Sequence, residues 1–154
     1  MENKNNINIS YKLVKVKILS YSVLYFEDII LGKRIPNFTF EISGAQIIRE
    51  ETKTIDVMTT VKVFLEPDKK ELAGEIKTLN QFEIFNYNEV LKGKNNTANI
   101  PKEFLATILG LSISNTRGMM IAKSTGTILE NAILPILNPF DIIKNIFKDQ
   151  KHGT

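Results

Sequence analysis

The chain opens with a long stretch in which apolar and polar residues alternate. Over residues 12–18, valine and isoleucine at even positions alternate with lysine, which is the period of a strand with one solvated face. The apolar set then continues at odd positions from Leu19 to Tyr25. One extra residue in a strand moves every following side chain to the opposite face, so this change of phase predicts a β-bulge.

Three further strands are predicted downstream. Apolar and polar residues alternate over residues 38–43 and, most clearly, over 55–65, and a fourth stretch of mixed phase covers 72–87. Turns rich in Gly, Pro and charged residues fall over 32–37 and 66–70. Short or moderate connections between consecutive strands favour an antiparallel meander, because parallel neighbours need crossover helices between them.

The pattern becomes helical after a polar loop over residues 88–99. Pro101 is suited to a first helical position, and we expect the helix that it opens to end at Gly110. A longer helix is predicted over 115–131, and a last helix begins after Asn138, a good N-cap residue. Strands first and helices second predict an α+β fold: a four-stranded antiparallel β-meander followed by helices packed on one face.

The composition is that of an ordinary globular protein. The chain has 154 residues, of which 43% are hydrophobic and 24% charged, enough to bury a sizeable core. We expect a single domain over 1–154, with 1–11 and 149–154 as flexible tails. The N-terminus is polar, without the apolar segment of a secretory signal, and charges or prolines interrupt the apolar stretches, so we expect a cytoplasmic protein without membrane insertion.

Few residues in the chain suit catalysis or metal binding. There is no cysteine, and the single histidine, His152, lies near the end of the chain. Disulfides, His/Cys metal sites and Ser-His-Asp catalysis are therefore not expected, and the sequence contains no glycine-rich phosphate-binding motif. We expect a protein that is not an enzyme and needs no cofactor.

A basic strand offers a binding alternative. Lys12, Lys15 and Lys17, with Tyr21 and Tyr25 nearby, could follow a nucleic-acid backbone and stack on its bases. The same lysines are equally typical of the solvated face of an amphipathic strand. The net charge is only +3 and is not clustered, so we favour the solvated face and expect no nucleic-acid partner.

More apolar material is present than a simple fold needs, over residues 82–87, 104–113 and 133–140. Three interpretations stay open at this point: core, oligomer interface, or a hydrophobic ligand groove, since large exposed apolar patches mark binding sites.

The order of several short motifs resembles the SecB family of protein-export chaperones. The motifs are Glu83-Ile84-Phe85 at the end of the fourth strand, Leu109-Gly110, the helix that carries Arg117, and Asn138-Pro139-Phe140-Asp141 before the last helix. Each motif is short, and their order and spacing over residues 12–150 carry the resemblance.

The resemblance implies a four-stranded sheet with a long helix on one face, assembled as a dimer of dimers. Small residues at Gly118, Ala122 and Gly126 would let the long helices of different subunits pack closely in a homotetramer. It also implies an ATP-independent chaperone that holds unfolded preproteins for export. The apolar residues that fall in the segments forming the family's groove walls are Ile84, Phe85, Phe104, Leu105, Leu109, Leu111, Ile113, Leu134, Leu137 and Phe140.

The family also implies docking of SecA, the translocase motor, on an acidic sheet face. This chain departs from that pattern, because its pI is about 9.0 and its C-terminal end is not acidic. Of two docking positions that the resemblance implies in the first strand, one carries the acidic Glu27 and the other carries Val23. The alternative is a SecB-like chaperone for one dedicated client, such as an antitoxin.

Overall fold

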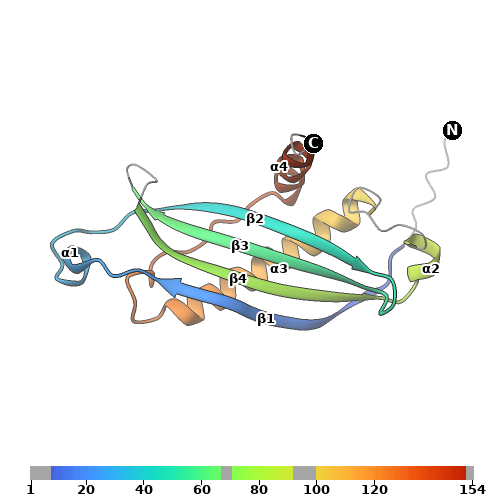
Figure 1. Cartoon of the computed structure of the whole chain (residues 1–154), viewed down its shortest axis with the longest axis horizontal. Helices are drawn as coiled ribbons and strands as arrows, with labels where there is room; N and C mark the ends of the chain where they lie inside the picture. The colour runs from blue at the N-terminus through green and yellow to red at the C-terminus, as the bar shows by residue number, and fades with distance from the viewer. Residues whose placement is uncertain (1–7, 67–70, 92–99, 152–154) are drawn as a thin grey trace.

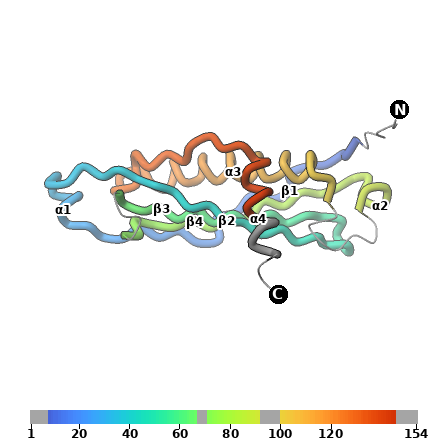
Figure 2. The backbone as a smooth tube through the Cα atoms, turned by 90° about the horizontal axis from the view of Figure 1, so that it is seen from above, coloured from blue at the N-terminus to red at the C-terminus, as the bar shows by residue number. Residues whose placement is uncertain are grey.

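The computed structural model describes residues 8–66, 71–91 and 100–151, which form one antiparallel sheet with a helical layer on one face (Figure 1). Figure 2 shows the two layers edge-on, with the sheet on one side and the long helix on the other. The elements that build the sheet are β1 (Tyr11–Val23), β2 (Phe38–Arg49), β3 (Thr54–Leu65) and β4 (Glu71–Ile84).

The strand order is β1-β4-β3-β2, which corrects the predicted meander. The antiparallel direction of every pair is as expected, and β2, β3 and β4 are consecutive neighbours. The first strand, however, pairs with β4 rather than with β2. Residues 24–37, which include the short helix α1 (Glu27–Ile30), carry the chain from one edge of the sheet to the other (Figure 1). This connection is much longer than the hairpin turn over 50–53, and its length permits the crossing.

The predicted bulge in the first strand is confirmed. Between β1 and β4 the register skips Leu19, where the apolar phase changes, and it also skips Val14. The bulge at Val14 places Lys15 and Lys17 on the outer face of the sheet and Ile18 toward the helical layer, and the bulge at Leu19 keeps Tyr21 toward that layer as well. Bulges of this kind are common in edge strands, where they disrupt the ladder locally.

The alternation in the third strand is confirmed by burial. Ile55, Val57, Val61, Val63 and Leu65 lie on the helix side of β3 and are at most 3% exposed. Helix α3 (Lys102–Ser124) packs on this face, over β3 and β4.

A single continuous helix replaces the two that were predicted. Gly110 does not end α3, and the helix stops at Ser124 rather than continuing to residue 131. A Cβ at Gly110 would lie 3.1 Å from Cγ of Pro139, so this glycine permits a close approach of the chain instead of a helix end. Gly126 lies beyond the helix with φ of +78°, a conformation that favours glycine.

The end of the fourth strand also differs from the expectation. Strand β4 ends at Ile84, and Tyr87 belongs to the short helix α2 (Tyr87–Val90). Val90 and Leu91 are 2% and 0% exposed, so the start of the predicted polar loop is part of the core. The remainder of that loop, residues 92–99, lies outside the described residues.

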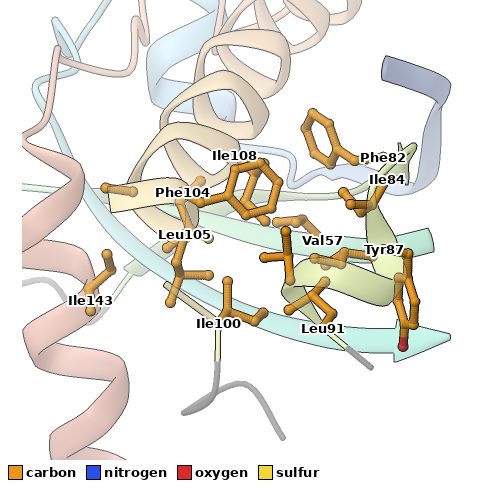
Figure 3. Packing of buried hydrophobic residues seen from close by; sticks show 14 residues of the cluster. Val57, Phe82, Ile84, Tyr87, Leu91, Ile100, Phe104, Leu105, Ile108 and Ile143 are labelled. Carbon is orange, nitrogen blue, oxygen red and sulfur yellow. The ribbon is translucent and has the colours of Figure 1, made fainter. Parts of the chain in front are cut away.

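Two apolar cores fill the space between sheet and helix. One lies under the N-terminal half of α3 and includes Phe82, Tyr87 and Ile108 (Figure 3). The other lies under its C-terminal half and includes Val61, Ile76 and Met120. Between them the sheet contributes buried polar side chains: Thr59, Thr78 and Asn80.

The last helix, α4 (Pro139–Lys151), begins in the helical layer and runs outward beside the β2 edge (Figures 1 and 2). Oδ1 of Asn138 accepts a hydrogen bond from the backbone N–H of Phe140 at 3.0 Å, which confirms the predicted cap. Ile143 is 1% exposed and joins the first core, and so anchors the helix.

Candidate functional site

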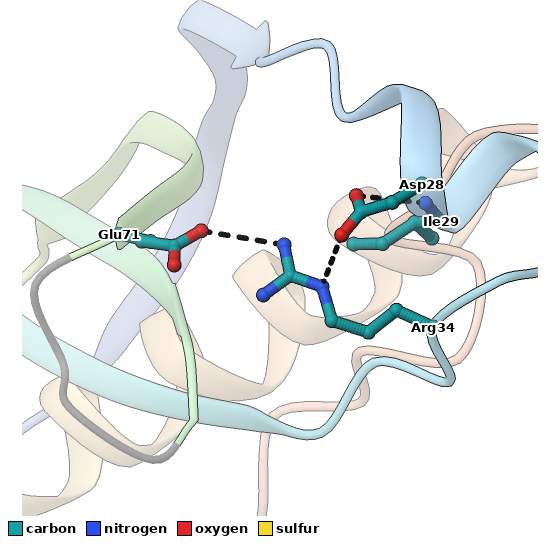
Figure 4. A network of polar contacts seen from close by, with 4 residues as sticks. All are labelled: Asp28, Ile29, Arg34 and Glu71. Carbon is teal, nitrogen blue, oxygen red and sulfur yellow. Dashed lines mark hydrogen bonds and ion pairs between the residues drawn. The ribbon is translucent and has the colours of Figure 1, made fainter.

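The crossing between β1 and β2 exposes a set of apolar side chains that the sequence alone did not identify as a group. Arg34 fixes the conformation of this loop, because its Nε lies 2.9 Å from Oδ2 of Asp28 and a terminal nitrogen donates to Oε2 of Glu71 at 3.3 Å (Figure 4). The guanidinium also lies 5.7 Å from the ring centroid of Phe26. The apolar residues that the loop leaves exposed, here called the tip patch, are Leu24, Tyr25, Ile30, Leu31 and Ile35.

A second exposed apolar segment runs between α3 and α4. In residues 133–137, here called the rim segment, Leu134 is 1% exposed, whereas Ile133 and Ile136 are 57% and 92% exposed. Arg117 of α3 holds this segment, because its Nε donates to the carbonyl oxygen of Leu134 at 2.7 Å and a terminal nitrogen to that of Pro135 at 2.8 Å. The rim segment thus presents two isoleucines to solvent in a fixed arrangement.

A hollow of about 510 Å³ lies where the start of α4 approaches the outer side of α3. Gly110 and Leu111 line it from α3, and Pro139 and Phe140 from α4. Leu111 and Phe140 are 42% and 39% exposed. The hollow is large enough for an apolar side chain of another molecule.

The ten predicted groove residues divide into two groups. Phe85, Leu111 and Phe140 are exposed and Leu137 is half-buried, and the structure brings Leu111 and Phe140 together around the hollow. The others lie inside the two cores of the single chain, so their side chains pack between sheet and helices. These buried residues are Ile84, Phe104, Leu105, Leu109, Ile113 and Leu134. The groove itself stays a prediction.

The small residues expected at a helix interface occupy two different places. Gly118 and Ala122 lie on the exposed side of α3, and a Cβ at Gly118 would meet no atom within 4 Å. Leu111 and Ile121 are exposed on the same helix. Gly126 lies past the end of α3, so it ends the helix rather than lining its face.

The predicted docking residue Glu27 lies in α1, beyond the end of β1, and is exposed. Val23, at the other docking position, is half-buried against the second core.

The three lysines of the nucleic-acid alternative, Lys12, Lys15 and Lys17, are exposed on the outer face of β1. Tyr21 lies on the opposite face, where its hydroxyl is 3.0 Å from Oγ of Ser124. The structure therefore separates the lysines from one of the two aromatic rings expected beside them.

Ionisable groups form no cluster that suggests chemistry in the described part of the chain, which contains no group of three or more His, Cys, Asp or Glu able to hold a metal ion. His152 lies outside the described residues. Burial, with a smaller effect of Glu50, raises the pKa of Tyr87. Among the described helices, none is long and apolar enough to cross a membrane.

Comparison with known proteins rests on structure alone, since no family model and no curated protein sequence matches the chain. The fold is similar to that of Rv1957, a SecB-like chaperone of Mycobacterium tuberculosis solved in complex with a peptide from the antitoxin HigA1. The TM-score is 0.51 at 12% identity, over 83% of this chain and 87% of that one. The fold is SecB-like.

A second similar structure, a protein of unknown function from Streptococcus agalactiae, has a TM-score of 0.33 at 11% identity over 76% of this chain and 89% of that one. The SecB-like fold predicted from the order of short motifs is confirmed by the match to Rv1957. Within this fold, the tip patch, the rim segment and the α3–α4 hollow are three of the exposed apolar features of the described residues.

Proposed function

We propose that this chain is a SecB-like chaperone that binds unfolded polypeptides on exposed apolar side chains, without nucleotide. The observation that carries the proposal is the contrast between two well-buried cores and isoleucines such as Ile35 and Ile136, which are 88% and 92% exposed. Contiguous exposed apolar patches on soluble proteins mark binding sites.

The apolar surface would bind by contact area rather than by sequence. Each Å² of apolar surface removed from water contributes about 25 cal/mol, and no directional group is needed. An unfolded chain offers apolar side chains all along its length, so several weak contacts at the tip patch, the rim segment and the α3–α4 hollow would add up on one client.

Export of preproteins in the cytoplasm is the setting that the family resemblance implies. SecA is not proposed as a partner, because Glu27 lies beyond the strand and the outer face of β1 carries Lys15 and Lys17.

A chaperone dedicated to one client is the second candidate. The similar structure of Rv1957 contains a peptide from an antitoxin, which favours this possibility. An affinity purification from the native host distinguishes the two: many unfolded precursors indicate a general chaperone, whereas one abundant protein indicates a dedicated one.

We also propose that the chain assembles through the exposed side of α3 into a homotetramer. Ile121 supplies apolar area there, and Gly118 and Ala122 would allow a second helix to approach closely.

The binding proposal is tested with a permanently unfolded, fluorescently labelled polypeptide. We expect an increase in fluorescence anisotropy on addition of the chaperone, with or without ATP, and no increase with the folded form of the same polypeptide. A matched pair of variants locates the site: Ile136→Ser should weaken binding, whereas Lys123→Gln, at an exposed charge on α3, should not.

A further inference from the structure

Arg117 joins helix α3 to the rim segment. It is half-buried on α3 and donates to two consecutive carbonyl oxygens, those of Leu134 and Pro135, at 2.7 and 2.8 Å. A guanidinium offers five N–H donors in a rigid plane, which suits such paired acceptors. The side chain therefore fixes the direction of the rim segment relative to α3.

The orientation of the rim segment decides which side chains face solvent. Leu134 packs in the second core, and Ile133 and Ile136 face outward. Rotation of the backbone at these positions would exchange buried and exposed side chains. By holding the carbonyl groups, Arg117 keeps the two isoleucines outward.

The charge of Arg117 is not neutralised inside the described part of the chain. The ion pairs within 4.0 Å there involve Arg34, Arg49 and Lys77, and none involves Arg117. Both recorded partners of Arg117 are neutral carbonyl groups, and the bond to Pro135 is exposed. Among the described residues, a positive charge with N–H donors left over thus lies beside the segment that carries the exposed isoleucines.

We propose that Arg117 and the rim segment form a client subsite that prefers extended segments in which aliphatic residues accompany a carboxylate. The occupant is an unfolded polypeptide, so the inference rests on the proposed function and adds a chemical preference to it. Arg117 acts as a positioning residue for Ile133 and Ile136, and its charge complements that of an aspartate or glutamate in the client.

The test uses three fluorescein-labelled peptides of equal length in a glycine and serine background. Each contains two isoleucines, and the residue between them is Glu, Gln or Lys. We expect the Glu peptide to bind about two- to fivefold more tightly than the Gln peptide, as for a solvent-exposed ion pair, and the Lys peptide to bind most weakly. The preference should vanish at about 1 M salt, where the Debye length falls to about 3 Å.

Two variants separate position from charge. Ile136→Ser should lower the affinity for all three peptides by a similar factor and leave the ratio of the Glu-peptide to the Gln-peptide affinity unchanged. Arg117→Gln should lower the affinity for all three peptides and make the affinities for the Glu and Gln peptides equal. Arg117→Lys should also lower the affinity, because lysine cannot bind two carbonyl groups in one plane, but should keep part of the preference for the Glu peptide. Lys123→Gln is the matched control on the same helix and should change nothing.

Equal affinities of the wild-type protein for the Glu and Gln peptides at low salt would overturn this inference. This measurement uses the wild-type protein alone, so it does not depend on whether any variant folds. A ratio that survives in Arg117→Gln would overturn it as well. Either result leaves the proposed function standing if the unfolded polypeptide still binds. Failure of the protein to bind any unfolded chain would instead remove the proposed function.

Discussion

The hydroxyl groups of Thr78 on β4 and Thr116 on α3 lie 2.7 Å apart, and both side chains are fully buried. Thr116 also donates to the carbonyl oxygen of Ser112 at 2.8 Å. Since a threonine hydroxyl carries one hydrogen, Thr78 must be the donor in the bond between the two. Next to this pair, Asn115 donates to Oδ1 of Asn80 at 2.7 Å. Polar bonds therefore fix the position of α3 on the sheet between the two apolar cores.

We expect Thr116→Val to destabilise the protein by about 1–3 kcal/mol, because it leaves the buried hydroxyl of Thr78 without an acceptor. The double variant Thr78→Val with Thr116→Val should recover much of that loss, since both polar groups are then absent. Urea denaturation of the two single variants and the double variant measures the coupling. A double variant whose loss equals the sum of the two single losses would contradict this assignment of the bond.

Two glycines provide a matched pair of tests for packing. A Cβ at Gly74 would lie 2.6 Å from Cδ1 of Leu129 and 2.6 Å from the carbonyl oxygen of Ser22, so Gly74→Ala should cost about 1–3 kcal/mol. A Cβ at Gly118 meets nothing, and Gly118→Ala should stabilise the isolated chain by about 0.5–1 kcal/mol through helix propensity. Thermal or urea unfolding checks both, and equal effects of the two substitutions would contradict the packing described.

Much of the fold follows from local patterns in the sequence. The alternation in β3 identifies its buried face, and the change of phase at Leu19 locates a bulge, because both depend only on the two-residue period of a strand. The cap that Asn138 provides for α4 was also predictable, because its hydrogen bond joins residues only two positions apart.

The wrong predictions concern features that depend on distant parts of the chain. Gly110 does not end a helix. A glycine is needed at this position because Pro139, at the start of α4, approaches α3 closely there. The pairing of β1 with β4 is not encoded in either strand alone. In the candidate site, Leu134 and Ile136 look alike in sequence, but Leu134 packs in the second core and Ile136 faces solvent, a difference that depends on residues distant in the chain.

The ionisation of Tyr87 should contribute to the loss of stability at high pH. Burial raises the pKa of its hydroxyl above the usual value of 10.0, so the unfolded chain releases this proton at a lower pH than the folded chain does. The stabilisation is fully present below about pH 10 and is lost as the pH rises through the folded-state pKa. We expect the free energy of unfolding of Tyr87→Phe to fall less steeply above pH 10 than that of the wild type. Parallel curves would show that Tyr87 ionises equally in both states.

The proposed assembly predicts a tetramer that depends on the exposed side of α3. Ile121 is 44% exposed in the single chain, so Ile121→Glu should leave folding intact and reduce the oligomer. Light scattering coupled to size-exclusion chromatography gives the mass, with Lys123→Gln as the control. A stable monomer of wild-type protein at high concentration would contradict the assembly.

The most direct test of the chaperone function follows the aggregation of a chemically denatured test protein after dilution, by light scattering. We predict suppression at a roughly stoichiometric ratio without nucleotide, and weaker suppression by a double variant, Ile35→Ser with Ile136→Ser, that retains the wild-type unfolding curve. Aggregation that proceeds unchanged in the presence of folded wild-type protein would contradict the account.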